Sequence, residues 1–165
     1  MTKMTHEQML ESIPYMKLYE GIDFRYHKEL YRVGLGEQGA LIVEPYKSEI
    51  ASYWRFSTPA VAQKSANKIF VMFLEYMRLD DFPGADMARK FLQMGWSRSR
   101  RYANHPSGRK YKSGTREILP LADDCYTSQK AKSAEIFKEV YDRARTNSLY
   151  LKMKREHQLR YPFKG

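Results

Sequence analysis

The sequence predicts a single, mostly helical α+β domain with about four helices and a small β-hairpin. Three observations predict this fold. Apolar residues recur at helical spacing through the middle and the C-terminal part of the chain. Two short β-type runs flank a glycine-rich loop before residue 44. The 165 residues are 42% hydrophobic and 14% aromatic, so the chain can bury a core without disulfides or metal ions.

The first 45 residues begin with a short amphipathic stretch that Pro14 breaks. We expect residues 1–23 to form an N-terminal extension and residues 24–165 to form the single globular domain. Residues 24–30 can form a helical turn. Residues 31–33 (Tyr-Arg-Val) and 40–43 (Ala-Leu-Ile-Val) are then the two arms of the predicted hairpin, and Pro45 ends the second arm.

A helix is predicted from Pro59 to about Arg78. Thr58 is a suitable N-cap, and proline is favoured at the first helical position. One face of this helix is apolar and is expected to be buried; it consists of Ala62, Ala66, Ile69, Phe70, Phe73 and Met77.

A turn at residues 80–84 precedes a second predicted helix. Its inward face is expected to contain Met87, Ala88, Phe91 and Leu92. Arg89 and Lys90 are expected to face the solvent. Gly95 can cap the end of this helix, or the helix can continue through residues 98–103.

Residues 104–124 are predicted to form a long loop, because they contain two prolines and two glycines. Thr127 or Ser128 then begins a third helix that runs to about Arg145. Asn147 or Ser148 begins a last helix that runs to about Gln158.

The net charge of +10 is concentrated in two segments. Residues 96–116 contain seven Lys or Arg and no Asp or Glu, and residues 143–165 contain seven Lys or Arg and one acid. Such a charge distribution attracts polyanions. The cations of the second segment are expected either to cover the outer face of a last helix or to form a second wall of one polyanion site.

The acid-free segment contains the candidate binding residues. Arginine presents a rigid fork of donors that fits phosphate oxygens, tyrosine can stack on a base, and Asn or His can hydrogen-bond to a base edge. If residues 96–103 are helical, Arg98, Arg101 and Tyr102 share one face. The alternative interpretation is a solvated basic loop. The candidate phosphate- or nucleic-acid-binding residues are Arg98, Arg100, Arg101, Tyr102, Asn104, His105, Arg109, Lys110, Tyr111 and Lys112.

The loop with Gly34, Gly36 and Gly39 has the spacing of a nucleotide-binding motif. The dinucleotide-binding version needs a helix after the glycines, whereas β-type residues follow here. The loop is therefore expected to be a tight hairpin turn, with a phosphate-binding loop as the alternative.

Catalysis and metal binding are not indicated. The four histidines are far apart in the sequence, and Cys125 is the only cysteine, so we expect no metal site, no cofactor and no intramolecular disulfide. A nuclease remains an alternative, with Asp86, Glu37 or Glu44 on a metal ion, or with His105 as the base and Arg101 holding phosphate.

The N-terminus does not resemble a signal peptide, and no apolar run approaches the roughly 18 residues of a membrane span. We therefore expect a cytoplasmic protein without a membrane partner. The sequence predicts no oligomeric state.

Several segments together resemble one family. They include FRYHKELYRVGLGEQGALIVEPYKSEI, YWRFSTPAVA, FPGADMARKFLQMGWSRSRRYANHPSGRKY and AEIFKEVYDRAR, and they extend over about residues 22–160. The chain is similar in these segments to the domain of unknown function 4385, a family of bacteria and their phages. The resemblance implies a location in a bacterial host cell and carries no catalytic or binding residues.

The function expected from the sequence is non-enzymatic binding of phosphate-rich anions, nucleic acid first among them. One alternative is a phage-type protein that sequesters a small, for example cyclic, nucleotide between the glycine loop and the basic segment. Further alternatives are a nuclease or other phosphodiesterase, and a protein whose basic face binds an acidic partner protein.

Overall fold

The computed structural model describes residues 19–33 and 41–162. Within these residues it has five α-helices, one 3-10 helix and no β-strand. The helices are α3 (Tyr46–Ala51), α4 (Pro59–Arg78), α5 (Phe82–Asn104), α6 (Gln129–Arg145) and α7 (Ser148–Arg160), and the 3-10 helix η1 is Lys28–Leu30.

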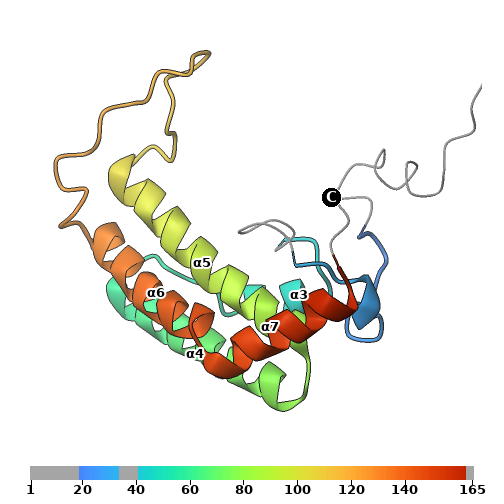
Figure 1. The fold of residues 1–165 in the computed structure, drawn as a ribbon. Coiled ribbons are helices and arrows are strands. Elements are labelled where there is room, and N and C mark those ends of the chain that lie inside the picture. Colours follow the sequence, from blue (N-terminus) through green and yellow to red (C-terminus); the bar gives the residue numbers. More distant parts are fainter. Residues whose placement is uncertain (1–18, 34–40, 163–165) are drawn as a thin grey trace, which may run out of the picture.

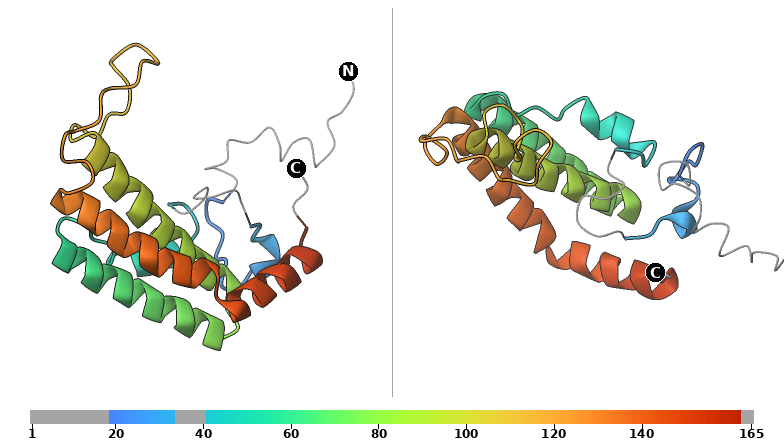
Figure 2. Two further views of the ribbon diagram at one scale, coloured as in Figure 1. Left: turned by 60° about the vertical axis from the view of Figure 1, so that its left-hand side comes forward. Right: turned by 90° about the horizontal axis from the view of Figure 1, so that it is seen from above.

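Helices α4, α5 and α6 lie side by side and form the body of the molecule (Figure 1). α7 leaves the end of α6 at an angle and packs against the first half of α5, where η1 also lies (Figure 2). The loop from α5 to α6 projects beyond the opposite end of the bundle, as Figure 1 and the left view of Figure 2 show. The molecule therefore has two distinct ends, one built around α7 and one formed by the long loop.

Three predicted helix starts are confirmed by their caps, whereas α5 begins at Phe82, inside the turn predicted at residues 80–84, with Asp81 as its cap. The Thr58 side chain accepts a hydrogen bond from the Val61 amide (3.3 Å), and Pro59 occupies the first turn of α4. Ser128 and Asn147 cap α6 and α7 in the same way. Each cap satisfies an amide that would lack a partner in the first helical turn.

The second predicted helix continues to Asn104, so Gly95 lies inside α5 and does not end it. The reason is the packing of α5 on α6. A Cβ atom at Gly95 would lie 2.3 Å from Cδ1 of Phe137 on α6, which is closer than side chains approach. Glycine is needed here because it lets the Phe137 ring reach the backbone of α5.

The expected α+β class and its β-hairpin are wrong, because the described chain has no strand. Residues 31–33 are irregular and residues 41–43 include a turn, while Gly34, Gly36, Gly39 and Ala40 lie outside the described residues. Tyr31 and Val43 are instead buried in the helical core, Tyr31 with its hydroxyl on Asp86 of α5. Burial against helices, and not strand pairing, explains these two apolar runs.

The expected outward orientation of Arg89 and Lys90 is also wrong. Their side chains are only 8% and 1% exposed, because both lie next to Asp86 one turn earlier on α5. The expected inward residues Met87, Ala88, Phe91 and Leu92 are all fully buried. The first half of α5 is thus buried all round, by the bundle on one side and by α7 and the segment before α3 on the other.

The N-terminal boundary at residue 24 stays a prediction. Tyr19 and Ile22 are partly buried and pack against the core, and the Tyr19 ring meets Phe24 edge-on at 5.0 Å between centroids.

Candidate anion-binding surface

The last turns of α5 carry the first predicted site residues. Arg98, Arg101 and Tyr102 are exposed and follow the helical spacing that places them on one side of α5. The Arg98 guanidinium lies over the Trp54 ring, 5.3 Å from its centroid. Arg101 has no partner among the described residues, so its guanidinium is available to a ligand.

The Arg100 side chain does not join this group and instead contacts the long loop between α5 and α6. Its Nε donates to Oδ1 of Asn104 (3.2 Å), a second guanidinium nitrogen donates to the Cys125 carbonyl, and the group lies over the Tyr126 ring. The Asn104 carbonyl in turn accepts from the Ala122 amide (2.9 Å). Arg100 and Asn104, both predicted to contact the ligand, are therefore engaged at the base of the loop.

We call residues 105–128 the arm. Its outer part is a short hairpin-like turn, in which the Leu119 amide donates to the Lys110 carbonyl (2.8 Å) and the Lys112 amide donates to the Glu117 carbonyl (2.9 Å). Tyr111 and Ile118 form an antiparallel bridge between these bonds. Gly114 has a φ of +75°, a conformation that favours glycine, and lies at the tip. Arg109, Lys110, Lys112 and Arg116 are all exposed along this arm.

His105, the first residue of the arm, and Tyr102 of α5 are packed at the base of the arm. His105 caps α5, is 6% exposed, and has a buried Nδ1 without a hydrogen-bond partner in the described chain. Its carbonyl accepts from the Gly108 amide (2.7 Å). Gly108 has a φ of +76°, and a Cβ atom there would lie 3.1 Å from the Tyr102 ring. His105 does not face an approaching ligand, and part of the Tyr102 ring is covered by the arm.

The charge of this surface is not compensated within the described chain. None of the seven cations between residues 96 and 116 forms a salt bridge with a described carboxylate, whereas seven Lys or Arg pairs with a carboxylate occur elsewhere in the described chain. Six of the seven, all except Arg100, are exposed. We define the basic surface as these six residues: Arg98, Arg101, Arg109, Lys110, Lys112 and Arg116.

The C-terminal cations do not join the basic surface. Lys152, Lys154 and Arg155 lie on α7, whose Tyr150 hydroxyl donates to Asp86 near the start of α5. Arg101 follows Asp86 by fifteen residues, which corresponds to about 22 Å along a helix. The structure thus places the two basic segments at different ends of the molecule.

A buried ionic cluster in α5 was not expected from the sequence. Asp86 is fully buried and accepts hydrogen bonds from Tyr31, from Tyr150 (2.6 Å) and from Arg89 (2.8 Å), while Lys90 Nζ lies 3.9 Å from it. The Asp-x-x-Arg-Lys spacing, with charges at i, i+3 and i+4, is the sequence signal that could have revealed it.

The pKa values in this cluster follow from burial and charge. Burial alone would raise the pKa of Asp86, but Arg89, Lys90 and the two tyrosine hydroxyls outweigh it and hold the pKa below its usual range. Burial lowers the pKa of Lys90 to about 8, against the opposing effect of Asp86. The Asp86 carboxylate is buried and accepts hydrogen bonds from Tyr31, Tyr150 and Arg89, so it is not accessible to a metal ion from solvent. No three His, Cys, Asp or Glu side chains of the described chain group into a metal site.

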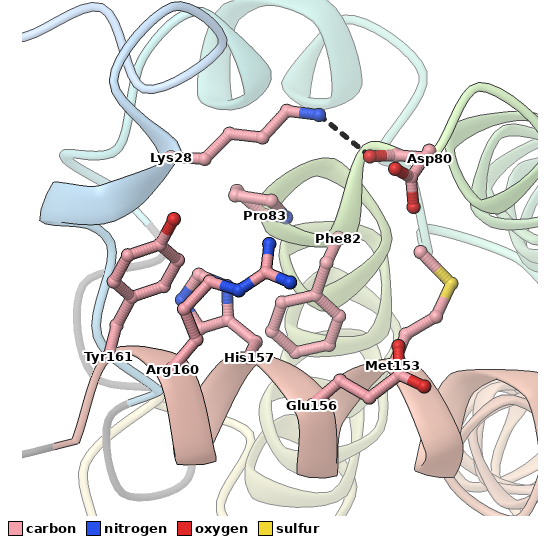
Figure 3. Close-up of a pocket in the computed structure, with 9 residues that line it drawn as sticks. All are labelled: Lys28, Asp80, Phe82, Pro83, Met153, Glu156, His157, Arg160 and Tyr161. Carbon is pink, nitrogen blue, oxygen red and sulfur yellow. Dashed lines mark hydrogen bonds between the residues drawn. The ribbon is translucent and has the colours of Figure 1, made fainter.

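A cavity of about 270 Å³ lies at the α7 end, far from the basic surface (Figure 3). Lys28 crosses its rim and donates to the Asp80 carbonyl (2.7 Å). His157 lies in its wall and donates from Nε2 to the Tyr31 carbonyl (2.7 Å). Burial lowers the pKa of His157, which keeps the imidazole neutral at neutral pH. The other lining residues are Phe82, Pro83, Met153, Glu156, Arg160 and Tyr161.

This cavity is not the one that the small-nucleotide alternative requires. That alternative needs a pocket between the glycine loop and residues 98–111, and no residue of the basic surface lines the cavity. Gly34, Gly36 and Gly39 lie outside the described residues, so their proposed role stays a prediction.

Taken together, the fold and the surface define a helical bundle with a projecting arm that carries four exposed cations and the exposed acids Glu117, Asp123 and Asp124. A family model for a domain of unknown function, DUF4385, matches residues 14–160, and the chain belongs to this family. Comparison with curated proteins and with solved structures gave no match. Among the described helices, none is long and apolar enough to cross a membrane.

Proposed function

We propose that this protein binds nucleic acid through the basic surface, mainly by electrostatic contacts with phosphate groups and without covalent chemistry. The observation that supports this most is the set of six exposed cations that have no carboxylate partner in the described chain. On α6, by comparison, Lys138 and Arg145 both pair with Asp142.

Arginine dominates the part of the basic surface on α5. Its planar fork can donate two parallel hydrogen bonds to one phosphate, whereas lysine acts as a point charge. The arm adds two lysines and two arginines on a segment that projects away from the bundle. This combination favours an extended polyanion over a small enclosed ligand.

The predicted salt dependence is steep. Each phosphate that a cation neutralises releases condensed counterions, so six contacts correspond to a slope of about −5 in a plot of log K against log salt concentration. Affinity should then fall by about a thousandfold between about 50 and 200 mM salt.

The test compares two double variants of the full chain. Arg98→Gln/Arg101→Gln removes two cations of the basic surface, and Lys152→Gln/Arg155→Gln removes two exposed cations of α7 as a matched control. Binding to fluorescently labelled DNA is measured by anisotropy at several salt concentrations. We expect the first variant to reduce the salt slope by about two and the control to leave it unchanged.

Two results would contradict the proposal. One is the absence of binding to any single- or double-stranded DNA or RNA at low salt. The other is equal loss of affinity in both variants, which would mean that net charge and not this surface determines binding. A thermal shift with cyclic nucleotides in the absence of polymer binding would favour the small-nucleotide alternative.

A further inference from the structure

We propose that the preferred ligand is duplex DNA, and that the outer arm, residues 110–119, enters its major groove while Arg98 and Arg101 contact the neighbouring phosphates. This inference rests on the proposed function, because it names the class of nucleic acid that the same surface binds.

The shape of the outer arm fits a wide groove. Its two segments are joined by two backbone hydrogen bonds on either side of the isolated Tyr111–Ile118 bridge, so its backbone has the width of a two-stranded ribbon although the paired part is too short to form β-strands. The major groove of B-DNA is about 12 Å wide and admits a two-stranded ribbon, whereas the minor groove is about 6 Å wide. The major groove of an RNA duplex is deep and too narrow for side chains to read. Duplex DNA is therefore the nucleic acid that this ribbon matches.

The length of the ribbon also suits this groove. The backbone is extended from Lys110 to Lys112, over about 7 Å, and then reverses in a turn in which the Thr115 amide donates to the Lys112 carbonyl (3.0 Å). The groove is about 8.5 Å deep. The outer arm, with the exposed Lys112 and Arg116 side chains near its tip, can enter the groove while the end of α5 stays outside, near the phosphates.

The arm is held in a defined direction at its base. The Ala122 amide bonds to the Asn104 carbonyl, Arg100 bonds to the Cys125 carbonyl, and Gly108 lies against Tyr102. These contacts join both ends of the arm to the last turn of α5. A ligand that meets both the arm and α5 therefore binds a surface whose parts are already joined to each other, which lowers the entropic cost of binding.

The tyrosines favour a duplex over a single strand. Single-stranded nucleic acids bind by stacking their bases on open aromatic faces. Here the Lys130 ammonium lies 5.9 Å from the Tyr102 ring centroid, the Lys110 ammonium lies 5.6 Å from that of Tyr111, and Arg100 lies 5.3 Å from that of Tyr126. Each of these rings already has a cation of this protein over one face, so at most one face is open to a base.

The experiment measures affinity of the full chain for three ligands of one sequence: duplex DNA, duplex RNA and single-stranded DNA, at one salt concentration. The tip variant Lys112→Gln/Arg116→Gln is compared with Lys152→Gln/Arg155→Gln on α7. Both pairs are exposed, so neither change should alter the melting temperature, which is measured as a check on folding.

We expect duplex DNA to bind about tenfold or more tightly than the other two ligands. The tip variant should lose most of this preference, and the α7 control should retain it. Methylation of guanine N7, which lies in the major groove, should interfere with binding, and methylation of adenine N3, which lies in the minor groove, should not.

Three results would overturn groove insertion while leaving nucleic-acid binding intact. The first is that the wild-type protein binds the three ligands with equal affinity. The second is that the tip variant loses affinity equally for all three ligands. The third is that methylation of guanine N7 does not interfere with binding. If none of the three ligands binds, the proposed function itself is wrong and the inference falls with it.

Discussion

Replacing Asp86 by Asn tests the buried ionic cluster of α5. The substitution keeps the size of the side chain and removes its charge. Asp86 accepts hydrogen bonds from Tyr31, Tyr150 and Arg89 and lies 3.9 Å from the Lys90 ammonium, all with almost no exposure to solvent. The variant therefore leaves two buried cations without their shared counter-charge.

The expected loss is about 3–5 kcal/mol, the cost of removing one partner of a buried ion pair. Most domains are stable by only about 5–15 kcal/mol, so this is a large part of the total. For a chain of this size each kcal/mol lowers the melting temperature by about 2–4 °C, which gives a decrease of roughly 10 °C. Because the folded-state pKa of Asp86 is below its ordinary value, this stabilisation is complete at neutral pH and is lost on acidification.

The assay is urea unfolding at neutral pH, followed by far-ultraviolet circular dichroism. Asp123→Asn is the control, since Asp123 is exposed in the arm. Adding Lys90→Met to Asp86→Asn should recover part of the lost stability, because it removes one of the uncompensated charges. A loss below about 1 kcal/mol for Asp86→Asn, or no recovery in the double variant, would refute the reasoning.

Three further changes test packing, titration and capping. Gly95→Ala should destabilise by about 1–3 kcal/mol in urea unfolding, because its methyl group meets the Phe137 ring; a stabilised variant would contradict this close approach. His157 has a lowered pKa, so the unfolded state takes up its proton first and wild-type stability should decrease as the pH falls through about 6.5. The stability of the His157→Gln variant should decrease less between about pH 7.5 and pH 5.5 than that of the wild type. If both proteins show the same pH dependence, another group titrates. Ser128→Ala should lower the melting temperature through a loss of about 1 kcal/mol, whereas the neighbouring Thr127→Ala should not; equal effects would argue against the cap.

The helices of the bundle could be predicted because their signals are local. The Thr58-Pro59 pair, Ser128 and Asn147 cap three helices where the sequence indicates, and the apolar face of α4 is buried apart from the half-buried Phe70. A cap depends on residues within one turn, so it can be recognised without knowledge of the tertiary structure.

The hairpin could not be predicted correctly, because short apolar runs are ambiguous. The runs around Tyr31 and Val43 have β-type residues, yet each is buried against helices from distant parts of the chain. Burial by a helix and pairing in a sheet select the same residue types over such short lengths.

The candidate surface was predicted in part. The sequence shows which segment lacks acids, and Arg101 and the cations of the arm are indeed exposed without a described carboxylate partner. It does not show that Arg100 and Asn104 join the arm to α5, or that His105 is buried. These differences depend on contacts between residues about 20 positions apart, which residue type alone does not specify.

The sequence by itself determined the starts of α4, α6 and α7, the excess of positive charge and its division into two segments. Only the tertiary structure decided that these segments lie at different ends, that Arg89 and Lys90 are buried beside Asp86, and that the arm projects from the bundle. The physical reason is the range of the interactions. Helix propensity, capping and net charge depend on near neighbours, whereas burial and charge compensation depend on which distant side chains the fold brings together.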